Sequence, residues 1–221
     1  MVCSARCIAL LAPLVVGAVA WWTDWLPLKL GVPALCICIL LSVKGEAFRR
    51  APSALLACGA FAASIVGDYY LSTRGGSDAH FVAGIAAFGV AHLFYIAYAL
   101  ANGRMHLPVL GIALAGFGAW FALDLAHAIE DRAIWVAALV YTVLSCVALG
   151  AAAGIRSVAW VKVPCLVGIA LIVFSDSLIA LAEFAGDRTL SELILPTYYL
   201  AQIAITLSAL HLLERGRSDA H

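Results

Sequence analysis

Two aspartates lie inside stretches of sequence that are otherwise apolar enough to cross a lipid bilayer. Asp68 lies in the segment 62–71, and Asp176 lies in the segment 160–184. A carboxylate at the centre of a lipid-facing helix costs about 2.5 to 3.5 kcal/mol on insertion scales, so such a group is expected to face a polar interior and to mark a functional site. The sequence therefore predicts a water-containing pocket that holds both carboxyl groups.

Four further polar side chains in apolar segments are the expected partners of these aspartates. His92 and Tyr95 are three positions apart and therefore share one helix face. Tyr199 and Gln202 have the same spacing on the last apolar segment. We expect all four to line the pocket and to contact substrate. The simpler structural explanation is an interhelical hydrogen-bond network, in which each contact is worth about 0.6 kcal/mol.

The composition is that of a membrane protein. Hydrophobic residues make up 65% and charged residues 12% of the 221 positions, and the mean hydropathy is +1.04. These values lie outside the range of soluble globular domains and indicate an integral membrane protein. The 13 basic and 13 acidic residues balance to zero net charge, so neither nucleic acid nor an anionic surface is indicated as a partner.

Apolar segments separated by short polar breaks predict an all-α polytopic bundle of about eight transmembrane helices. The long apolar blocks lack the ten-residue alternation of a membrane β-barrel, so helices are the structure that satisfies the backbone in hydrocarbon. We expect residues 1–213 to form a single transmembrane domain and residues 214–221 to form a short polar tail. The first segment imitates a signal peptide, but seven further spans offer it packing partners, so we expect it to be retained. The segments are 7–22, 28–43, 52–73, 79–100, 107–127, 133–153, 160–184 and 195–213.

Basic residues are unequally distributed between alternate loops, which predicts the orientation of the bundle. Cytoplasmic loops carry an excess of Lys and Arg, so the richer side is expected to face the cytoplasm together with both termini. We expect a multi-pass protein of a bacterial-type inner (cytoplasmic) membrane. The richer side holds Arg6, Lys44, Arg49, Arg50, Arg104, Arg156, Lys162, Arg215 and Arg217, and the other side holds Lys29, Arg74, Arg132 and Arg188.

This orientation places the proposed pocket in the outer half of the membrane. Asp68 lies about five residues, or roughly 7 Å, from the outer end of its helix at the rise of an α-helix. Asp176 lies about eight residues, or roughly 12 Å, from the outer end of its own helix. We therefore expect the pocket to open toward the non-cytoplasmic side.

Two other kinds of chemistry fit the sequence poorly. A retinal protein needs a lysine in the middle of a helix, whereas Lys29, Lys44 and Lys162 lie at the ends of predicted spans. A zinc hydrolase needs about three protein ligands, and among the histidines only His92 and His211 lie within spans. We therefore expect neither a metal ion nor another cofactor.

The order of several short motifs resembles the YhhN-type membrane proteins, which include the lysoplasmalogenases. The matching elements are Lys29 before Pro33 and the segments 64–71, 84–95, 168–176 and 199–202. The resemblance implies hydrolysis of the vinyl ether bond of a lysoplasmalogen, with a lysophospholipid as substrate and the lipid bilayer as surroundings. It implies that Asp68 and Asp176 are the catalytic pair and that Lys29 belongs to the substrate site. The chain departs from the family pattern because Leu30, Gly31 and Val32 separate Pro33 from Lys29, whereas the lysine is adjacent to the proline in the family.

The chemistry of a vinyl ether suits two carboxyl groups. Protonation of the β-carbon gives an oxocarbenium ion, which water attacks to form a hemiacetal that then collapses to a fatty aldehyde and a glycerophospho-base (ethanolamine or choline). This reaction needs an acid and a water-activating base beside a cationic intermediate, as in inverting glycosidases. Two carboxyls buried close together favour a state in which one keeps its proton while the other is ionised.

The alternative function is a membrane carrier for a small amphiphile or a proton-coupled solute. Intramembrane aspartates also mark ion pathways in transporters. No inverted repeat is visible between the two halves of the sequence, which favours the enzyme. Turnover by purified protein without a gradient would distinguish the two.

Overall fold

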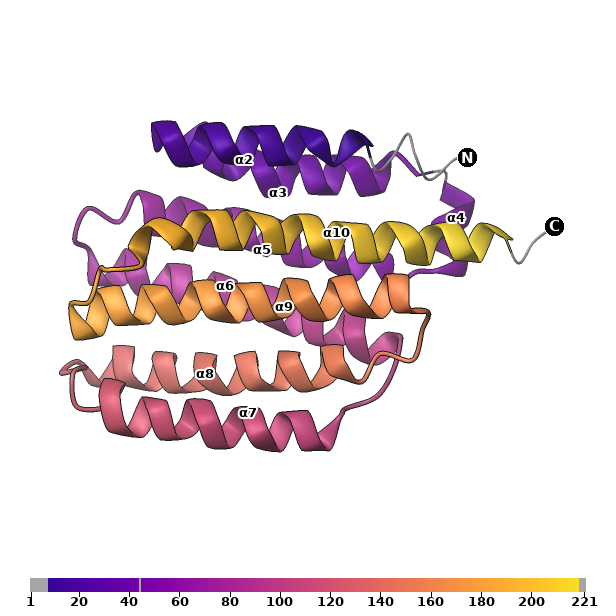
Figure 1. Ribbon diagram of the computed structural model, residues 1–221. Coiled ribbons are helices and arrows are strands. Elements are labelled where there is room, and N and C mark those ends of the chain that lie inside the picture. Colours follow the sequence, from indigo (N-terminus) through magenta and orange to yellow (C-terminus); the bar gives the residue numbers. More distant parts are fainter. Residues whose placement is uncertain (1–7, 44, 219–221) are drawn as a thin grey trace.

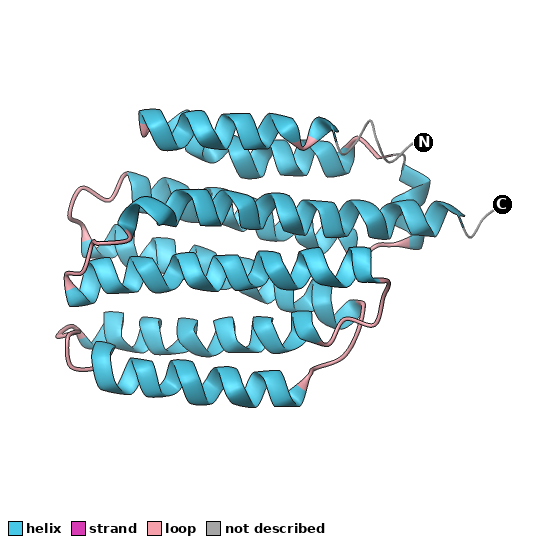
Figure 2. Ribbon diagram, viewed as in Figure 1, coloured by secondary structure: helices cyan, strands magenta, loops and turns pink. Residues whose placement is uncertain are grey.

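The computed structural model describes residues 8–43 and 45–218, and in these ranges every regular element is a helix (Figures 1 and 2). The two ends of the bundle are formed by the interhelical loops, and the residues described at the start of the chain and at its end lie at the same end of the bundle (Figure 1). The α-helices are α2 (Leu11–Thr23), α3 (Leu26–Leu41), α4 (Gly45–Arg50), α5 (Ala54–Ser72), α6 (Asp78–Ala101), α7 (Leu107–Trp120), α8 (Arg132–Ala153), α9 (Ala159–Ala180) and α10 (Ile194–Ser218).

Six helical stretches are long and apolar enough to cross a membrane, and they make this an integral multi-pass membrane protein. They correspond to the last six of the predicted spans. The first two predicted spans correspond to shorter apolar helices, α2 with 13 residues and α3 with 16. A turn separates these two helices at Asp24, whose backbone is left-handed, and the proline in the first turn of α3 restarts the helix.

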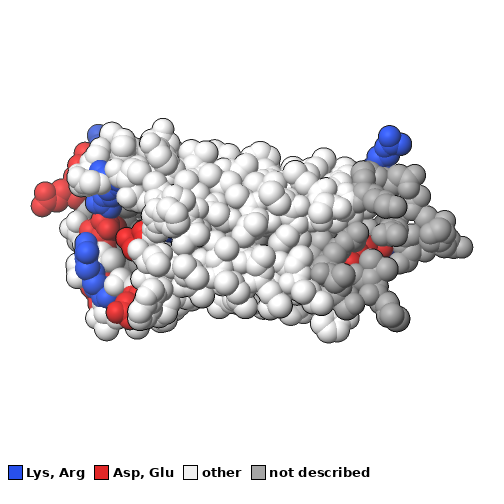
Figure 3. Space-filling model, turned by 90° about the horizontal axis from the view of Figure 1, so that it is seen from above, with Lys and Arg blue, Asp and Glu red and all other residues white. Residues whose placement is uncertain are grey.

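The long helices α5, α6, α9 and α10 form the centre of the bundle. Helices α5 and α6 pack along one another, as do α9 and α10, and α8 contacts both α6 and α9. The antiparallel pair of α2 and α3 packs on α5 and α10 at one side, whereas α7 packs mainly on α8 at the other (Figure 1). On the face that Figure 3 shows, charged side chains gather at one end of the bundle and a few lie at the other, with an uncharged band between them.

Close packing of α9 on α10 depends on a glycine. A Cβ at Gly168 would lie 2.6 Å from Cγ1 of Ile205 and 2.9 Å from the backbone oxygen of Ala201. Small residues let helix backbones approach one another in membranes, where no hydrophobic driving force acts between helices. The glycine therefore lets α10 lie directly against the helix that carries Asp176.

Side chains cap the helices that follow two of the loops. The carboxylate of Asp131 accepts hydrogen bonds from the backbone N–H groups of Ala133 (2.7 Å) and Ile134 (2.9 Å) at the start of α8. The hydroxyl of Ser77 accepts from the backbone N–H of His80 at the start of α6. Both caps fix the points at which the chain re-enters the bundle.

The structure differs from the sequence predictions at several helix ends. Helices α7 and α9 each continue into a π-helical turn, Phe121–Leu125 (η1) and Leu181–Ala185 (η2), and these two turns contact one another. A short 3-10 turn, η3 (Ser191–Leu193), precedes α10. Helix α10 extends to Ser218, so residues 214–218 of the expected polar tail are helical, and residues 219–221 lie outside the described part. The short helix α4 was not predicted.

Candidate active site

The aspartates of α5 and α9 line the same cavity. Asp68 and Asp176 both contribute to the wall of a cavity of about 520 Å³, which also reaches the loops after α5 and after η2. The two aspartates come from helices that are far apart in the sequence, and the packing of α10 against both α5 and α9 brings them to one space. The structure therefore places these two carboxyl groups in the wall of one pocket, as the sequence predicts.

The carboxylate of Asp68 is held by a tyrosine of α10. The phenol of Tyr198 donates a hydrogen bond of 3.0 Å to Oδ2 of Asp68. Tyr198 is only 6% exposed, and its ring lies edge-on to Phe88 with a centroid separation of 5.9 Å. Burial and the contact with Phe88 therefore fix the hydroxyl that orients this carboxylate.

The carboxylate of Asp176 is held in the same way by a tyrosine of α8. The phenol of Tyr141 donates a hydrogen bond of 2.7 Å to Oδ2 of Asp176. The ring of His92 packs on Tyr141 at a centroid distance of 4.9 Å. Each aspartate of the pair is thus bound by a phenol from a neighbouring helix.

His92 lies beside Asp176 and presents one ring nitrogen to it. Nδ1 of His92 lies 3.0 Å from the backbone oxygen of Phe88, so this nitrogen is the one that carries a proton in the neutral ring. Nε2 then has a free lone pair, and it lies 3.9 Å from Oδ2 of Asp176 and 3.5 Å from the hydroxyl of Ser145. The distance to Asp176 is too long for a direct hydrogen bond but suits a bridging water or substrate group.

Three cationic side chains lie in the wall of the large cavity. Nζ of Lys29 lies 2.5 Å from Oδ1 of Asp24, and a guanidinium nitrogen of Arg74 lies 2.6 Å from Oε2 of Glu183. Arg188 is exposed on the loop after η2 and makes none of the ion pairs found within residues 8–43 and 45–218. Lys29, Arg74 and Arg188 all line the cavity.

A second, apolar cavity adjoins the first. It has a volume of about 80 Å³ and lies between α6, α7, α8 and α9, with aromatic rings such as Phe117, Trp120 and Phe184 in its wall. Asp176 lines both cavities, whereas Asp68 lines only the larger, charged one. Phe88 also belongs to both walls. The two cavities therefore share part of their wall, and Asp176 is the carboxyl in this shared part.

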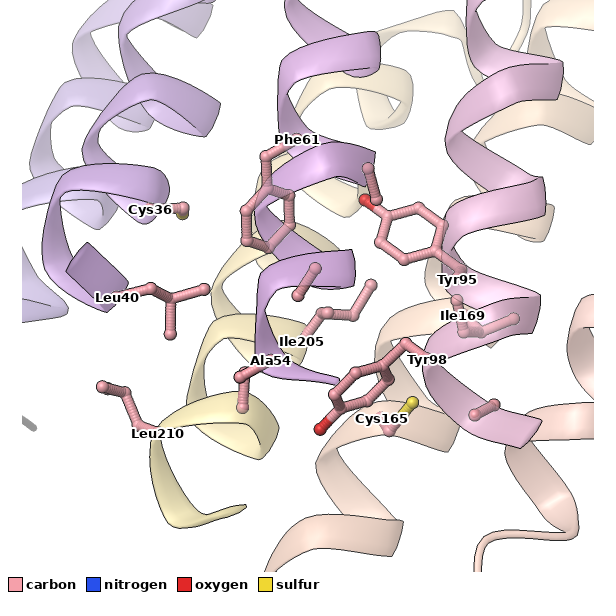
Figure 4. Close-up of a cluster of buried hydrophobic side chains, with 14 of the residues drawn as sticks. Cys36, Leu40, Ala54, Phe61, Tyr95, Tyr98, Cys165, Ile169, Ile205 and Leu210 are labelled. Atoms are coloured by element: carbon pink, nitrogen blue, oxygen red, sulfur yellow. The ribbon is translucent and has the colours of Figure 1, made fainter. Parts of the chain in front are cut away.

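Four of the predicted site residues lie outside both linings, and His92 beside Asp176 is one of them. Tyr95 is buried in the main core, where its ring lies edge-on to Phe61 at 6.3 Å (Figure 4). Gln202 is fully buried, and within the described ranges neither its amide oxygen nor its amide nitrogen has a hydrogen-bond partner. Tyr199 packs against Gly17 on α2, and its hydroxyl is likewise buried without a partner there. That these four residues contact substrate stays a prediction.

The two tyrosines that donate hydrogen bonds to the carboxyls were not predicted from the sequence. Tyr198 is not among the predicted site residues, because a tyrosine that follows a proline at a helix start is also typical of an interfacial anchor, yet it is the residue that bonds Asp68. Tyr141 was not singled out. Tyr141 is four positions before Ser145, so the two hydroxyls share one face of an apolar helix. This spacing could have indicated that the face lines the polar pocket.

The donor set at this site is suited to proton transfer. No group of three or more His, Cys, Asp or Glu side chains within the described part of the chain is arranged to hold a metal ion. Two carboxyls in one cavity can supply a general acid and a general base. The adjacent imidazole and phenols can position the carboxyls and a water molecule.

Comparisons with known proteins agree in one family. The model of the YhhN family matches residues 7–209 of the chain. Lysoplasmalogenase TMEM86B of Homo sapiens is 30% identical over 210 residues, which cover 90% of this chain and 86% of that protein. Lysoplasmalogenase TMEM86A of Homo sapiens is 30% identical over 186 residues, which cover 80% of this chain and 75% of that protein. No solved structure matches the chain.

Proposed function

We propose that this chain, which belongs to the YhhN family, is a membrane hydrolase that cleaves the vinyl ether bond of lysoplasmalogens. The products are a fatty aldehyde and a glycerophospho-base. The similar human proteins carry the name lysoplasmalogenase, and the alignments cover most of both chains. The substrate class is therefore a lysophospholipid that reaches the protein from the bilayer.

The observation that supports this function best is the pair of tyrosine-bound carboxyls in one cavity. Asp68 and Asp176 share the wall of the charged cavity, and each accepts a hydrogen bond from a phenol. A vinyl ether needs no nucleophile from the protein. It needs one proton donor and one group that activates water, and the cavity offers two carboxyls for these tasks.

The catalytic cycle uses one carboxyl in its protonated form and the other in its ionised form. The protonated carboxyl gives its proton to the β-carbon, and the ether oxygen shares its lone pair with the α-carbon to form the oxocarbenium ion. The ionised carboxyl stabilises this cation and takes a proton from the attacking water. Collapse of the hemiacetal then releases the aldehyde and the glycerol hydroxyl.

The neighbouring polar residues position the carboxyls, the water and the substrate. His92 accepts a bridging water through Nε2, beside Asp176. Lys29 lines the charged cavity and contributes to binding of the polar head. Tyr95, Tyr199 and Gln202 bind substrate or ordered water from the core side, where their polar atoms have no partner among the described residues.

The same proposal includes the arrangement in the membrane. With α2 and α3 as the two shorter spans, the bundle has eight transmembrane helices and forms one domain over residues 1–213. The basic residues in alternate loops favour cytoplasmic termini, with the charged cavity open to the other side. A helical bundle is the kind of protein found in a cytoplasmic-type membrane, since bacterial outer-membrane spanning proteins are typically β-barrels.

The decisive experiment measures aldehyde release by purified protein in detergent, with no gradient present. We expect turnover of a lysoplasmalogen, no turnover of the saturated alkyl ether with the same head group, and poor turnover of the acyl lysolipid. Asp68→Asn and Asp176→Asn should each abolish release, because an amide cannot exchange the proton, whereas Asp124→Asn at an exposed position of η1 should not. Fatty acid release from the acyl lysolipid, lost in Asp68→Asn, would instead make the protein a lysophospholipase.

A further inference from the structure

We infer that the two adjoining cavities hold the two ends of one lysolipid, with the phosphate in the charged cavity and the start of the hydrocarbon chain in the apolar cavity. This inference rests on the proposed function, which it extends to the direction of the bound substrate. The direction assigns the acid to Asp176 and the base to Asp68. Each part follows from which residues line which cavity.

The charged cavity has the chemistry of a phosphate site. Lys29, Arg74 and Arg188 line it, and with one aspartate protonated its wall carries more positive than negative charge. Two of the cations already hold carboxylates, Lys29 with Asp24 and Arg74 with Glu183. Arg188 is the cation in the wall without such an ion pair in the described part of the chain, so its guanidinium is available to a phosphate.

The apolar cavity has the chemistry of a hydrocarbon slot. Its walls carry the rings of Phe117, Trp120 and Phe184, and the described residues that line it include no Lys or Arg. Its volume of about 80 Å³ holds only a short piece of an alkyl chain, so the rest of the chain must leave the bundle. Helix α7 forms one wall of this cavity and packs mainly on α8. Little of the surface of α7 is buried in the bundle, so the cavity is closest to lipid on the α7 side.

The position of Asp176 between the cavities decides the roles of the aspartates. In a vinyl ether the β-carbon is on the chain side and the ether oxygen is on the head side. Asp176 lines both cavities and so lies beside the β-carbon, whereas Asp68 lines only the charged cavity and so lies beside the α-carbon and the ether oxygen. Asp176 is therefore the proton donor, and Asp68 is the base that activates water.

The proton balance closes with these roles. The Asp176 carboxyl gives its proton to the β-carbon, which bonds it with the electron pair of the double bond. Asp68 takes one proton from water as the water oxygen bonds to the α-carbon. When the hemiacetal collapses, its hydroxyl proton returns to Asp176 and the proton on Asp68 goes to the departing glycerol oxygen. The net reaction is vinyl ether plus water to aldehyde plus alcohol.

Binding of substrate analogues that cannot react tests the phosphate site separately from activity. The probes are an alkyl ether lysophosphocholine and the corresponding alkylglycerol, which lacks the phosphate. Arg188→Gln should weaken binding of the first probe at least about fivefold and leave the second unchanged. Arg132→Gln, a matched change at an exposed arginine that does not line the cavity, should affect neither. Equal binding of the phosphate probe by the Arg188 variant and the wild type would overturn the phosphate assignment, even if the enzyme turns over lysoplasmalogen.

The hydrocarbon slot is tested by filling it and by labelling it. Ala138→Phe, which adds a ring to the slot, should weaken binding of both probes, whereas Val140→Phe on the lipid-exposed side of α8 should not. Wild-type protein labelled with an alkyl ether lysophosphocholine that carries a diazirine near the ether should be modified on α7 or η2. Labelling confined to the loops 73–77 and 186–190 would reverse the direction of the substrate.

Chemical rescue distinguishes the base from the acid. Formate is ionised at neutral pH and can replace a missing carboxylate base in a water-filled cavity, but it cannot replace a proton donor. Asp68→Ala should regain aldehyde release about tenfold or more with added formate, and Asp176→Ala should not. Rescue of the Asp176 variant, or of neither variant while the wild type is active, would overturn the assignment. Absence of wild-type turnover together with intact probe binding would instead refute the proposed hydrolase.

Discussion

Gly67 lies so close to the ring of Phe88 that a Cβ at this glycine would be 2.7 Å from Cε2 of the ring. The glycine immediately precedes Asp68, and the ring belongs to the walls of both cavities and lies edge-on to Tyr198. The close packing of α5 on α6 at Gly67 therefore positions the ring of Phe88, and this ring in turn positions the phenol of Tyr198 that binds Asp68.

Gly67→Ala should lower turnover while leaving a folded protein. The added methyl group must push the ring of Phe88, and with it the hydroxyl of Tyr198 and the shared wall of the cavities. We expect a fall in kcat of about tenfold or more, measured as aldehyde release, with an unchanged elution profile in size-exclusion chromatography. Gly116→Ala, where no atom lies near the added Cβ, is the matched control and should behave as the wild type.

Removal of either phenol hydroxyl should slow the reaction without abolishing it. Tyr141→Phe and Tyr198→Phe each delete one hydrogen bond to a carboxyl of the aspartate pair. Loss of such a bond is worth about 1 to 3 kcal/mol, which corresponds to roughly 5- to 150-fold in kcat. Tyr69→Phe, on the lipid-exposed side of α5, should have no effect. Full activity of both variants would mean that the carboxyls are positioned by other groups.

His92→Ala should also reduce rather than eliminate aldehyde release. The imidazole is 3.9 Å from Asp176, so it acts through a water or the substrate and not as the primary acid or base. We expect a reduction of roughly 5- to 150-fold, with the exposed His127→Ala as control. If His92→Ala were as inactive as Asp68→Asn, the histidine would belong to the catalytic groups themselves.

Gln202→Leu should separate function from stability. A fully buried amide without a partner costs about 1 to 3 kcal/mol, so a leucine at this position should leave the melting temperature equal or higher. If the amide binds substrate or ordered water, as we propose, turnover should fall at the same time. A lower melting temperature with unchanged turnover would show that the amide has a purely structural role.

The orientation in the membrane is tested by labelling intact cells with an impermeant thiol reagent. In a background without the native cysteines, Thr189→Cys at the exposed loop beside the charged cavity should react. Arg104→Cys, in the loop at the opposite end that pairs with residues 154–156, should not. The reverse pattern would place the cavity mouth in the cytoplasm.

The helical class, the six long spans and the meeting of Asp68 with Asp176 could be predicted because they depend on hydropathy and on the high cost of an unpartnered charge in lipid. The tyrosines that bind the carboxyls could not be predicted with the same reasoning. A tyrosine near a helix end is equally compatible with an interfacial anchor, and only the packing of α10 on α5 shows that Tyr198 turns inward.

The smaller cavity could not be predicted from the sequence either. It depends on how four helices are spaced and on the two π-helical turns at their ends, and neither follows from an apolar run. Gln202 shows the opposite case. Its polarity in an apolar helix suggested a pocket residue, yet rotation of α10 places the amide in the core, away from both cavity walls.

The hydrogen bonds to the two aspartates have a consequence for assembly. One joins α5 to α10, and the other joins α8 to α9, so the proposed reaction centre is also a pair of cross-links between helices. No hydrophobic driving force acts between helices in lipid, so polar contacts help to select which helices pack together. Each interhelical hydrogen bond is worth about 0.6 kcal/mol on average. A chain without Asp68 and Asp176 would therefore also lose part of what selects the correct helix neighbours while the bundle is being inserted.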